Sequence, residues 1–134
     1  MTKLEQIQTT SAPAAIGPYS QAIKSGSMVF LSGQIPLDPT TKSKELVNGG
    51  IEIQTHQIFK NLIAVAEAAG GSLQDAVKLT IYMTNLDNFS DVNTIMAEYC
   101  NEPYPARATV QVSALPKGAL IEIDAILAIH RASD

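Results

Sequence analysis

RATVQVSALPKGALIEIDAILAIH, residues 107–130, is the stretch that decides the fold. Two segments of it, 107–113 and 120–130, have strand character, and the sequence ALPKGA between them suits a turn. In the second segment the apolar residues occupy every other position: Ile121, Ile123, Ala125, Leu127 and Ile129. Because side chains alternate across a strand, these residues share a face that packs under helices, and Glu122 and Asp124 point the other way.

Upstream of this stretch, the chain alternates between strand and helix patterns. Apolar residues recur at helical spacing over 50–69, and a Gly-Gly pair follows as a stop signal. A second amphipathic helix begins near Asp87, and Pro103 and Pro105 prevent it from continuing. Alternating or β-branched stretches predict further strands. These strands are 3–8, a hairpin of 19–24 and 28–35, and 77–84.

The order of these elements predicts an α+β fold in a single domain, 1–134, with a sheet of about six strands. Two helices of this length cover only one face of such a sheet, so the other face needs a different cover. Charged residues make up 16% of the 134 residues, against about 25% in an average soluble domain. A surface with few charges favours self-association as that cover.

Charge and cysteine content exclude several classes of protein. The formal net charge is −4 and the basic residues are scattered, which disfavours binding to nucleic acid. No signal pattern and no apolar run of about 20 residues appears, so we expect a cytoplasmic protein that does not enter a membrane. Cys100 lies on an apolar helix stripe and is expected to be a core thiol. With His56 and His130 far apart, no zinc-type spacing exists, and we expect no metal.

Arg107 and Glu122 are the candidate catalytic residues. Arg107 follows a proline-rich loop, and its rigid fork of donors suits a planar carboxylate; a surface or interface salt bridge is the structural alternative. Glu122 interrupts an aliphatic strand. Near Arg107 its pKa would be lowered and it would orient or deprotonate a water; simple alternation on a sheet face open to water is the alternative. Asp124 lies on the same face of the strand as Glu122, and the same two interpretations, functional and structural, apply to it.

Four other positions carry a functional and a structural interpretation. Tyr19 leaves a loop after Gly-Pro, where its phenol would donate into a cleft or simply pack. Ser32 and Gly33 interrupt a buried-looking strand, which indicates a ligand or another chain close to the backbone, or a local bulge. Asn93 lies in the second helix and either hydrogen-bonds across the sheet edge or is exposed. No phosphate-binding glycine loop and no GxSxG motif is present.

Several stretches in order along the chain resemble the Rid family, the reactive intermediate deaminases also called the YjgF family. The most specific is PARATVQVSALPKGALIEID, residues 105–124, in which Pro-Ala-Arg leads into a strand and Ile-Glu-Ile follows a Leu-Pro turn. The others are APAAIGPYSQAI (12–23), FLSGQIPLDP (30–39), VNGG (47–50) and LDNFSDVN (86–93). The resemblance covers essentially the full chain.

This resemblance implies a chorismate-mutase-like fold that assembles as a homotrimer, with sites in the clefts between subunits. It also implies hydrolysis of 2-imino acids, or their enamine tautomers, released by pyridoxal-phosphate-dependent threonine or serine dehydratases, to 2-oxo acids and ammonia without a cofactor. By the same resemblance Arg107 binds the substrate carboxylate and Glu122 positions the attacking water. The cleft-lining positions are Tyr19, Ser32, Gly33, Asn93 and the main chain of Thr109.

Two departures from the family pattern bear on the substrate. The segment CNEPY before Pro105 is shorter than in several relatives, so the rim near Tyr104 differs, and some deaminases carry cysteine where this chain has Thr109. Two other functions remain open. One is a trimeric module that binds small carboxylates such as 2-oxo acids through Arg107 without turnover. The other is a chaperone or a translation-inhibiting ribonuclease, against which the acidic balance argues.

Overall fold

One mixed sheet forms the framework of the computed structural model, which describes residues 3–41 and 45–130. Its strands are β1 (Leu4–Ile7), β2 (Ala22–Ser25), β3 (Met28–Gln34), β4 (Ala76–Met83), β5 (Ala106–Gln111) and β6 (Ile121–Ala128). They lie in the order β1-β2-β3-β6-β4-β5. All neighbours pair antiparallel except β4 and β5, which are parallel. The predicted α+β class and the six strands are confirmed.

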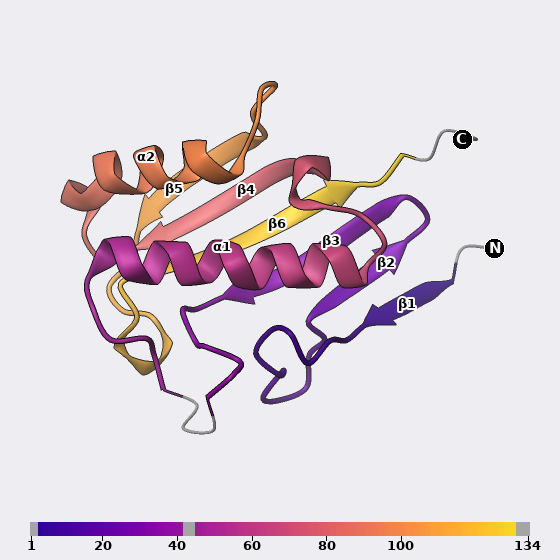
Figure 1. Cartoon of the computed structure of the whole chain (residues 1–134), viewed down its shortest axis with the longest axis horizontal. Coiled ribbons are helices and arrows are strands. Elements are labelled where there is room, and N and C mark those ends of the chain that lie inside the picture. Colours follow the sequence, from indigo (N-terminus) through magenta and orange to yellow (C-terminus); the bar gives the residue numbers. More distant parts are fainter. Residues whose placement is uncertain (1–2, 42–44, 131–134) are drawn as a thin grey trace.

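Both helices lie on the same face of the sheet (Figure 1). The first, α1 (Ile51–Ala68), ends where Gly70 adopts a φ of +90°, a left-handed conformation that glycine adopts readily. The second, α2 (Phe89–Tyr99), connects β4 to β5, because two parallel strands need a crossover between them. The two helices predicted from sequence spacing therefore both form. α1 lies within one residue of the predicted limits, and α2 begins two residues after Asp87 and ends before Pro103.

The core fills the space between this helix layer and the sheet. Every apolar side chain predicted to share a face of the last strand is buried. Beside them in the sheet are the buried β4 side chains Leu79, Ile81 and Met83, and opposite them are the buried α1 side chains Ile58, Phe59, Leu62 and Val65. Burial of each large side chain contributes roughly 1.5–3 kcal/mol. Cys100 is buried beside them as predicted, and burial raises the pKa of its thiol.

The other face of the sheet, here called the open face, carries a mixture of apolar and polar side chains. Phe30 of β3 is 48% exposed and Val110 of β5 is 42% exposed. Between them, the Tyr82 hydroxyl donates a 3.0 Å hydrogen bond to Asp124, and that bond together with burial raises the pKa of Tyr82. No helix of the described residues covers this face (Figure 1), as the sequence predicted.

One strand begins later than predicted. The hairpin strand expected from residue 19 starts at Ala22, and its partner β3 returns as expected. Residues 19–21 instead leave the sheet, and the buried Gln21 side chain hydrogen-bonds to the backbone of Thr9, Ala12 and Pro13. Because Gln21 makes its hydrogen bonds to the loop backbone, the regular strand pairing of β2 begins only after it, at Ala22.

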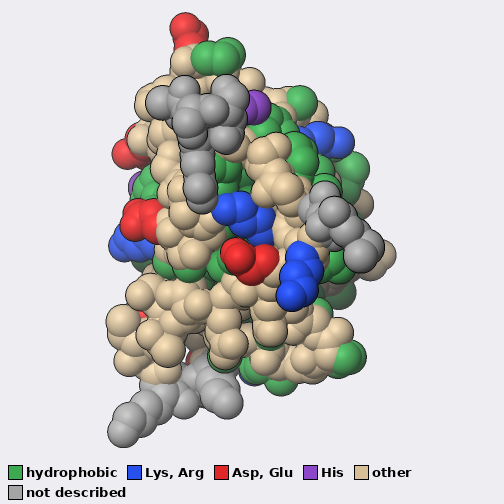
Figure 2. Space-filling view, turned by 90° about the vertical axis from the view of Figure 1, so that its right-hand side faces the viewer, with side chains coloured by type: hydrophobic (Ala, Val, Ile, Leu, Met, Phe, Trp, Pro, Cys, Tyr) green, Lys and Arg blue, Asp and Glu red, His purple; other side chains and the backbone are tan. Residues whose placement is uncertain are grey.

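The helices and surface also bear on the predicted location and partners. Neither helix in the described part of the chain is long and apolar enough to cross a membrane. Figure 2 shows the side of the molecule that lies to the right in Figure 1, where basic and acidic side chains adjoin one another instead of forming an area of one sign. That view contains no basic stripe of the kind that binds nucleic-acid phosphates.

Candidate functional site

A cavity of about 410 Å³ lies beside Glu122 and is here called the Glu122 pocket. The loop before β2, the end of β3 and the turn before β6 enclose it. Its lining residues are Pro13, Ala14, Ile16, Tyr19, Gln21, Gly33, Gln34, Ile35, Leu37, Pro116, Lys117 and Glu122. Three residues singled out in the sequence, Tyr19, Gly33 and Glu122, therefore meet in one place.

Glu122 reaches this pocket from the second position of β6, on the open face and in register with Tyr82. The start of the strand is fixed from the helix layer, since the Leu120 N–H donates to the buried Gln54 side chain of α1 at 2.9 Å. Burial, and next the charge of Asp124, raise the pKa of the Glu122 carboxyl. In the single chain Arg107 is not a neighbour of Glu122, so the lowering of this pKa expected beside Arg107 does not arise there.

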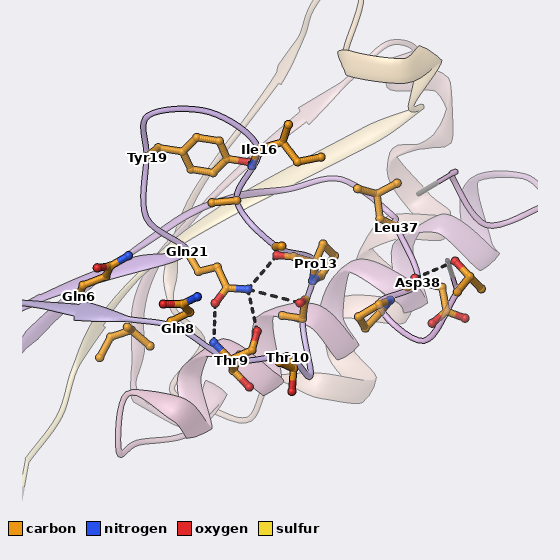
Figure 3. Close-up of a pocket in the computed structure, with 16 residues that line it drawn as sticks. Gln6, Gln8, Thr9, Thr10, Pro13, Ile16, Tyr19, Gln21, Leu37 and Asp38 are labelled. Carbon is orange, nitrogen blue, oxygen red and sulfur yellow. Dashed lines mark hydrogen bonds between the residues drawn. The ribbon is translucent and has the colours of Figure 1, made fainter. Parts of the chain in front are cut away.

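Tyr19 belongs to a loop that Gln21 holds in place (Figure 3). The Gln21 side chain donates to the Pro13 carbonyl at 2.8 Å and accepts from the Thr9 N–H at 2.7 Å. The Tyr19 ring is 52% exposed, and its hydroxyl accepts from the Ile16 N–H at 3.3 Å. This loop separates the Glu122 pocket from a second cavity of about 670 Å³, so the phenol stands at the rim of both.

Ser32 and Gly33 form a β-bulge. The register of β3 against β6 shifts between Leu31 and Gln34, so two residues stand opposite Asp124 alone. The Ser32 hydroxyl donates to the Ser20 carbonyl at 2.6 Å, which ties the bulge to the Tyr19 loop. The structural interpretation of this pair is thus confirmed, and the close approach expected at Gly33 is made by the Glu122 side chain.

Arg107 lies on the edge strand β5 and faces α2. Its Nη1 donates to the Asn93 side-chain oxygen and lies 3.7 Å from the Met96 sulfur, and its guanidinium carbon lies 5.0 Å from the centre of the Phe89 ring. The side chain is exposed, and among the described residues no carboxylate lies within ion-pair distance of it. Its charge is therefore held by neutral groups and remains able to bind an anion.

Asn93 and Thr109 both adjoin Arg107. Asn93 hydrogen-bonds across the sheet edge, one of its two predicted alternatives, by accepting from the guanidinium. Thr109 follows Arg107 by two residues on the same face of β5. Its hydroxyl oxygen is buried and has no hydrogen-bond partner within residues 3–41 and 45–130.

The candidate residues thus form two groups on opposite faces of the sheet. Arg107 is in register with Leu79, whose side chain is buried under the helices, whereas Glu122 is in register with Tyr82 on the open face. β4 separates their strands by roughly 10 Å across the sheet, and the two residues are also offset by three positions, roughly 10 Å, along the strands. A small ligand held by Arg107 cannot reach Glu122 of the same chain, because the sheet lies between them.

Some residues of the two groups were not predicted from the sequence. Phe89 and Met96 are apolar residues of the second amphipathic helix, and nothing in the sequence indicates that they contact a cation. Lys117 lines the Glu122 pocket from a turn and has a φ of 58°, unusual for a residue with a side chain. The only signal for it is its place between Pro116 and Gly118. No group of three or more potential metal-ligating side chains occurs in the described part of the chain.

Comparison with known proteins identifies close relatives. The model of the family described as Endoribonuclease L-PSP matches residues 9–129. A protein of Dermatophagoides farinae named 2-iminobutanoate/2-iminopropanoate deaminase is 44% identical over 124 residues, which are 92% of this chain and 95% of that protein. Other relatives of similar or higher identity are named only as RutC family proteins.

Solved structures agree with this relationship. RidA from the Antarctic bacterium Psychrobacter sp. PAMC 21119 is 50% identical, with a TM-score of 0.88 over 93% of this chain and 99% of that chain. TdcF of E. coli, whose structure contains bound serine, is 38% identical, with a TM-score of 0.84 over 94% of this chain and 99% of that chain. This chain therefore shares its fold with RidA and TdcF, and the TdcF structure contains the amino acid serine.

Proposed function

Because the chain belongs to the Rid (YjgF) family, we propose that it hydrolyses 2-imino acids, and their enamine tautomers, to 2-oxo acids and ammonia. The substrates are 2-iminobutanoate and 2-iminopropanoate, the two compounds for which the Dermatophagoides farinae relative is named. The observation that carries the proposal is the exposed Arg107 guanidinium, which is held by an amide, a thioether and an aromatic ring. Such a cation is available for a planar carboxylate.

The site is completed between two chains. Arg107 of one chain and Glu122 of the next enclose the substrate, since one chain presents them on opposite faces of its sheet. The assembly is a homotrimer, in which the open faces of the sheets, with Phe30 and Val110, are covered by neighbouring copies. A carboxylate on Arg107 then brings the C=N carbon of the substrate to the Glu122 pocket, which Tyr19 lines. Ser32 and the Thr109 main chain are the further contacts of the substrate in this proposal.

The chemistry needs few groups, because a protonated imine is already a strong electrophile. Glu122 accepts a proton from water as the water oxygen bonds to the C=N carbon, and a carbinolamine forms. Glu122 passes this proton to the nitrogen and then accepts the hydroxyl proton as the C=O bond forms and the C–N bond breaks. The ammonia that leaves takes up this last proton as ammonium, which returns Glu122 to its ionised form. Ionised Glu122 is the base of this exchange, and in the single chain it lies half-buried beside the Glu122 pocket. No metal, cofactor or covalent intermediate takes part.

The instability of 2-imino acids bears on where the protein acts in the cell. A 2-imino acid must be intercepted where it is made, so the protein acts in the cytoplasm beside the pyridoxal-phosphate-dependent threonine and serine dehydratases that release it. The deaminase name of the relative supports this, as does the amino-acid ligand of the TdcF structure. The net charge of −4 weighs against an RNA substrate.

A coupled assay tests the proposal. Threonine dehydratase generates 2-iminobutanoate, and formation of 2-oxobutanoate is followed with and without the protein, under conditions where the spontaneous hydrolysis is slow. We expect clear acceleration, proportional to the concentration of the protein. If the rate equals that of the dehydratase alone, while 2-oxobutanoate raises the melting temperature of the protein, the chain is a binding module instead.

A further inference from the structure

The Glu122 carboxyl group lies against the Cα of Gly33, in space that is free because glycine has no side chain. A Cβ built on Gly33 overlaps Glu122 Oε2 and lies 3.0 Å from its Cδ and 3.2 Å from its Cγ. Carbon atoms in ordinary contact are about 3.5–4.0 Å apart, so the last half of the Glu122 side chain occupies the space that any other residue would fill.

The bulge explains how a strand residue comes to lie under this carboxyl. Leu31 and Gln34 both point to the helix side and are buried, so Ser32 and Gly33 together occupy the single open-face position between them. Ser32 is fixed there by its hydroxyl bond to the Ser20 carbonyl and by its N–H bond to the Gln21 carbonyl at 3.0 Å. The bulge therefore presents the bare Cα of Gly33 to Glu122 in a fixed position.

We infer that Gly33 is a positioning residue that acts through Glu122, and that it does not itself bind the substrate. The inference deepens the proposed function and rests on it for the effect on turnover. By leaving room for the carboxyl, Gly33 keeps it within the Glu122 pocket and partly out of water. A methyl group at this position pushes the carboxyl toward solvent, away from the place where the water is activated.

Gly33→Ala separates this role from folding. The φ of Gly33 is not in the left-handed region, and the atoms displaced are the end of a flexible side chain, so the melting temperature is expected to change little. We expect kcat to fall by about 10- to 100-fold, a large part of what a positioned base contributes. KM changes little, because Arg107 still holds the carboxylate. Gly50→Ala is the control, since a Cβ there meets nothing within 4 Å.

The double variant Gly33→Ala/Glu122→Asp tests the contact itself. Aspartate is one methylene shorter, so its carboxyl avoids the new methyl group. We expect Gly33→Ala to lower kcat strongly in the native background and to have little effect in the Glu122→Asp background, which is the non-additivity of residues in contact. Equal fold-changes in both backgrounds would overturn the inference.

The pKa of Glu122, measured by carbon-13 NMR of its carboxyl, gives a readout that does not depend on turnover. Burial is the main cause of its raised pKa, so a carboxyl displaced toward water has a lower pKa. In Gly33→Ala we expect a fall of this pKa, and the acid limb of the kcat profile moves to lower pH with it. An unchanged pKa with native kcat contradicts the positioning role. A native protein without deaminase activity contradicts the proposed function instead, and leaves the pKa comparison decisive for Gly33.

Discussion

Arg107→Ala is expected to remove almost all turnover of 2-iminobutanoate and to leave the fold intact. The Arg107 side chain is exposed in the single chain, and its partners Asn93, Met96 and Phe89 all belong to α2. We therefore expect the free energy of unfolding to fall by about 1 kcal/mol or less. Removing one partner of a charge pair that is hydrogen-bonded and shielded from water costs about 2–5 kcal/mol. We therefore expect kcat/KM to fall by about 10³-fold.

Arg107→Lys is the matched control for charge. Lysine keeps the positive charge but lacks the planar fork that makes two parallel hydrogen bonds to a carboxylate. We expect this variant to retain more activity than Arg107→Ala and less than the native protein, and the loss to appear mainly in KM. Native kcat/KM in Arg107→Ala, measured in the coupled assay, would remove the proposed role of Arg107.

Glu122→Gln is expected to stop turnover while ligand binding persists. The amide has nearly the shape of the carboxyl but cannot accept a proton from water, and general-base catalysis contributes about 10²–10⁴-fold. We expect kcat to fall within that range. The rise in melting temperature with 2-oxobutanoate remains, because Arg107 is untouched. Coupled kinetics and thermal unfolding of the same preparation measure both quantities.

The result for Glu122→Gln separates catalysis from binding. Loss of turnover with retained thermal stabilisation is the pattern of an enzyme whose base has been removed. If turnover persists at the native rate, Glu122 is not the base. The raised pKa of this carboxyl then reflects only its burial and the neighbouring Asp124.

The layers of the fold were predictable because they follow local periodicity. The alternation over 120–130 and the helical spacing over 50–69 reproduce β6 and α1 closely, and the open face follows from counting two helices against six strands. The strand order was not predicted. β5 and β6 are consecutive in sequence, yet β6 lies between β3 and β4, and that arrangement depends on long-range pairing that no local pattern carries.

The candidate site was predicted in part, and for different reasons at different residues. Glu122 stands out from its own strand as a carboxylate among aliphatic residues. That Arg107 and Glu122 face opposite sides of the sheet depends on the parallel register of β5 against β4, which the sequence does not reveal. Likewise Gly33 was recognised as unusual, but its neighbour in space, the Glu122 side chain, is 89 positions further along the chain.

The central claim is that Arg107 and Glu122 act from different chains, and mixed assemblies test it most directly. Arg107→Ala and Glu122→Gln subunits, each nearly inactive alone, are co-expressed with different tags, and the mixed assemblies are purified through both tags. In every mixed trimer one of the three interfaces has both native residues. We therefore expect about a third of the native activity per trimer.

The control co-expresses Arg107→Ala with the double variant Arg107→Ala/Glu122→Gln, and no interface of that assembly has a native Arg107. It should be as inactive as Arg107→Ala alone. We expect recovery of about a third of the native rate in the first mixture and none in the control. A first mixture no more active than its two separate components would contradict it and would place the reaction within a single chain.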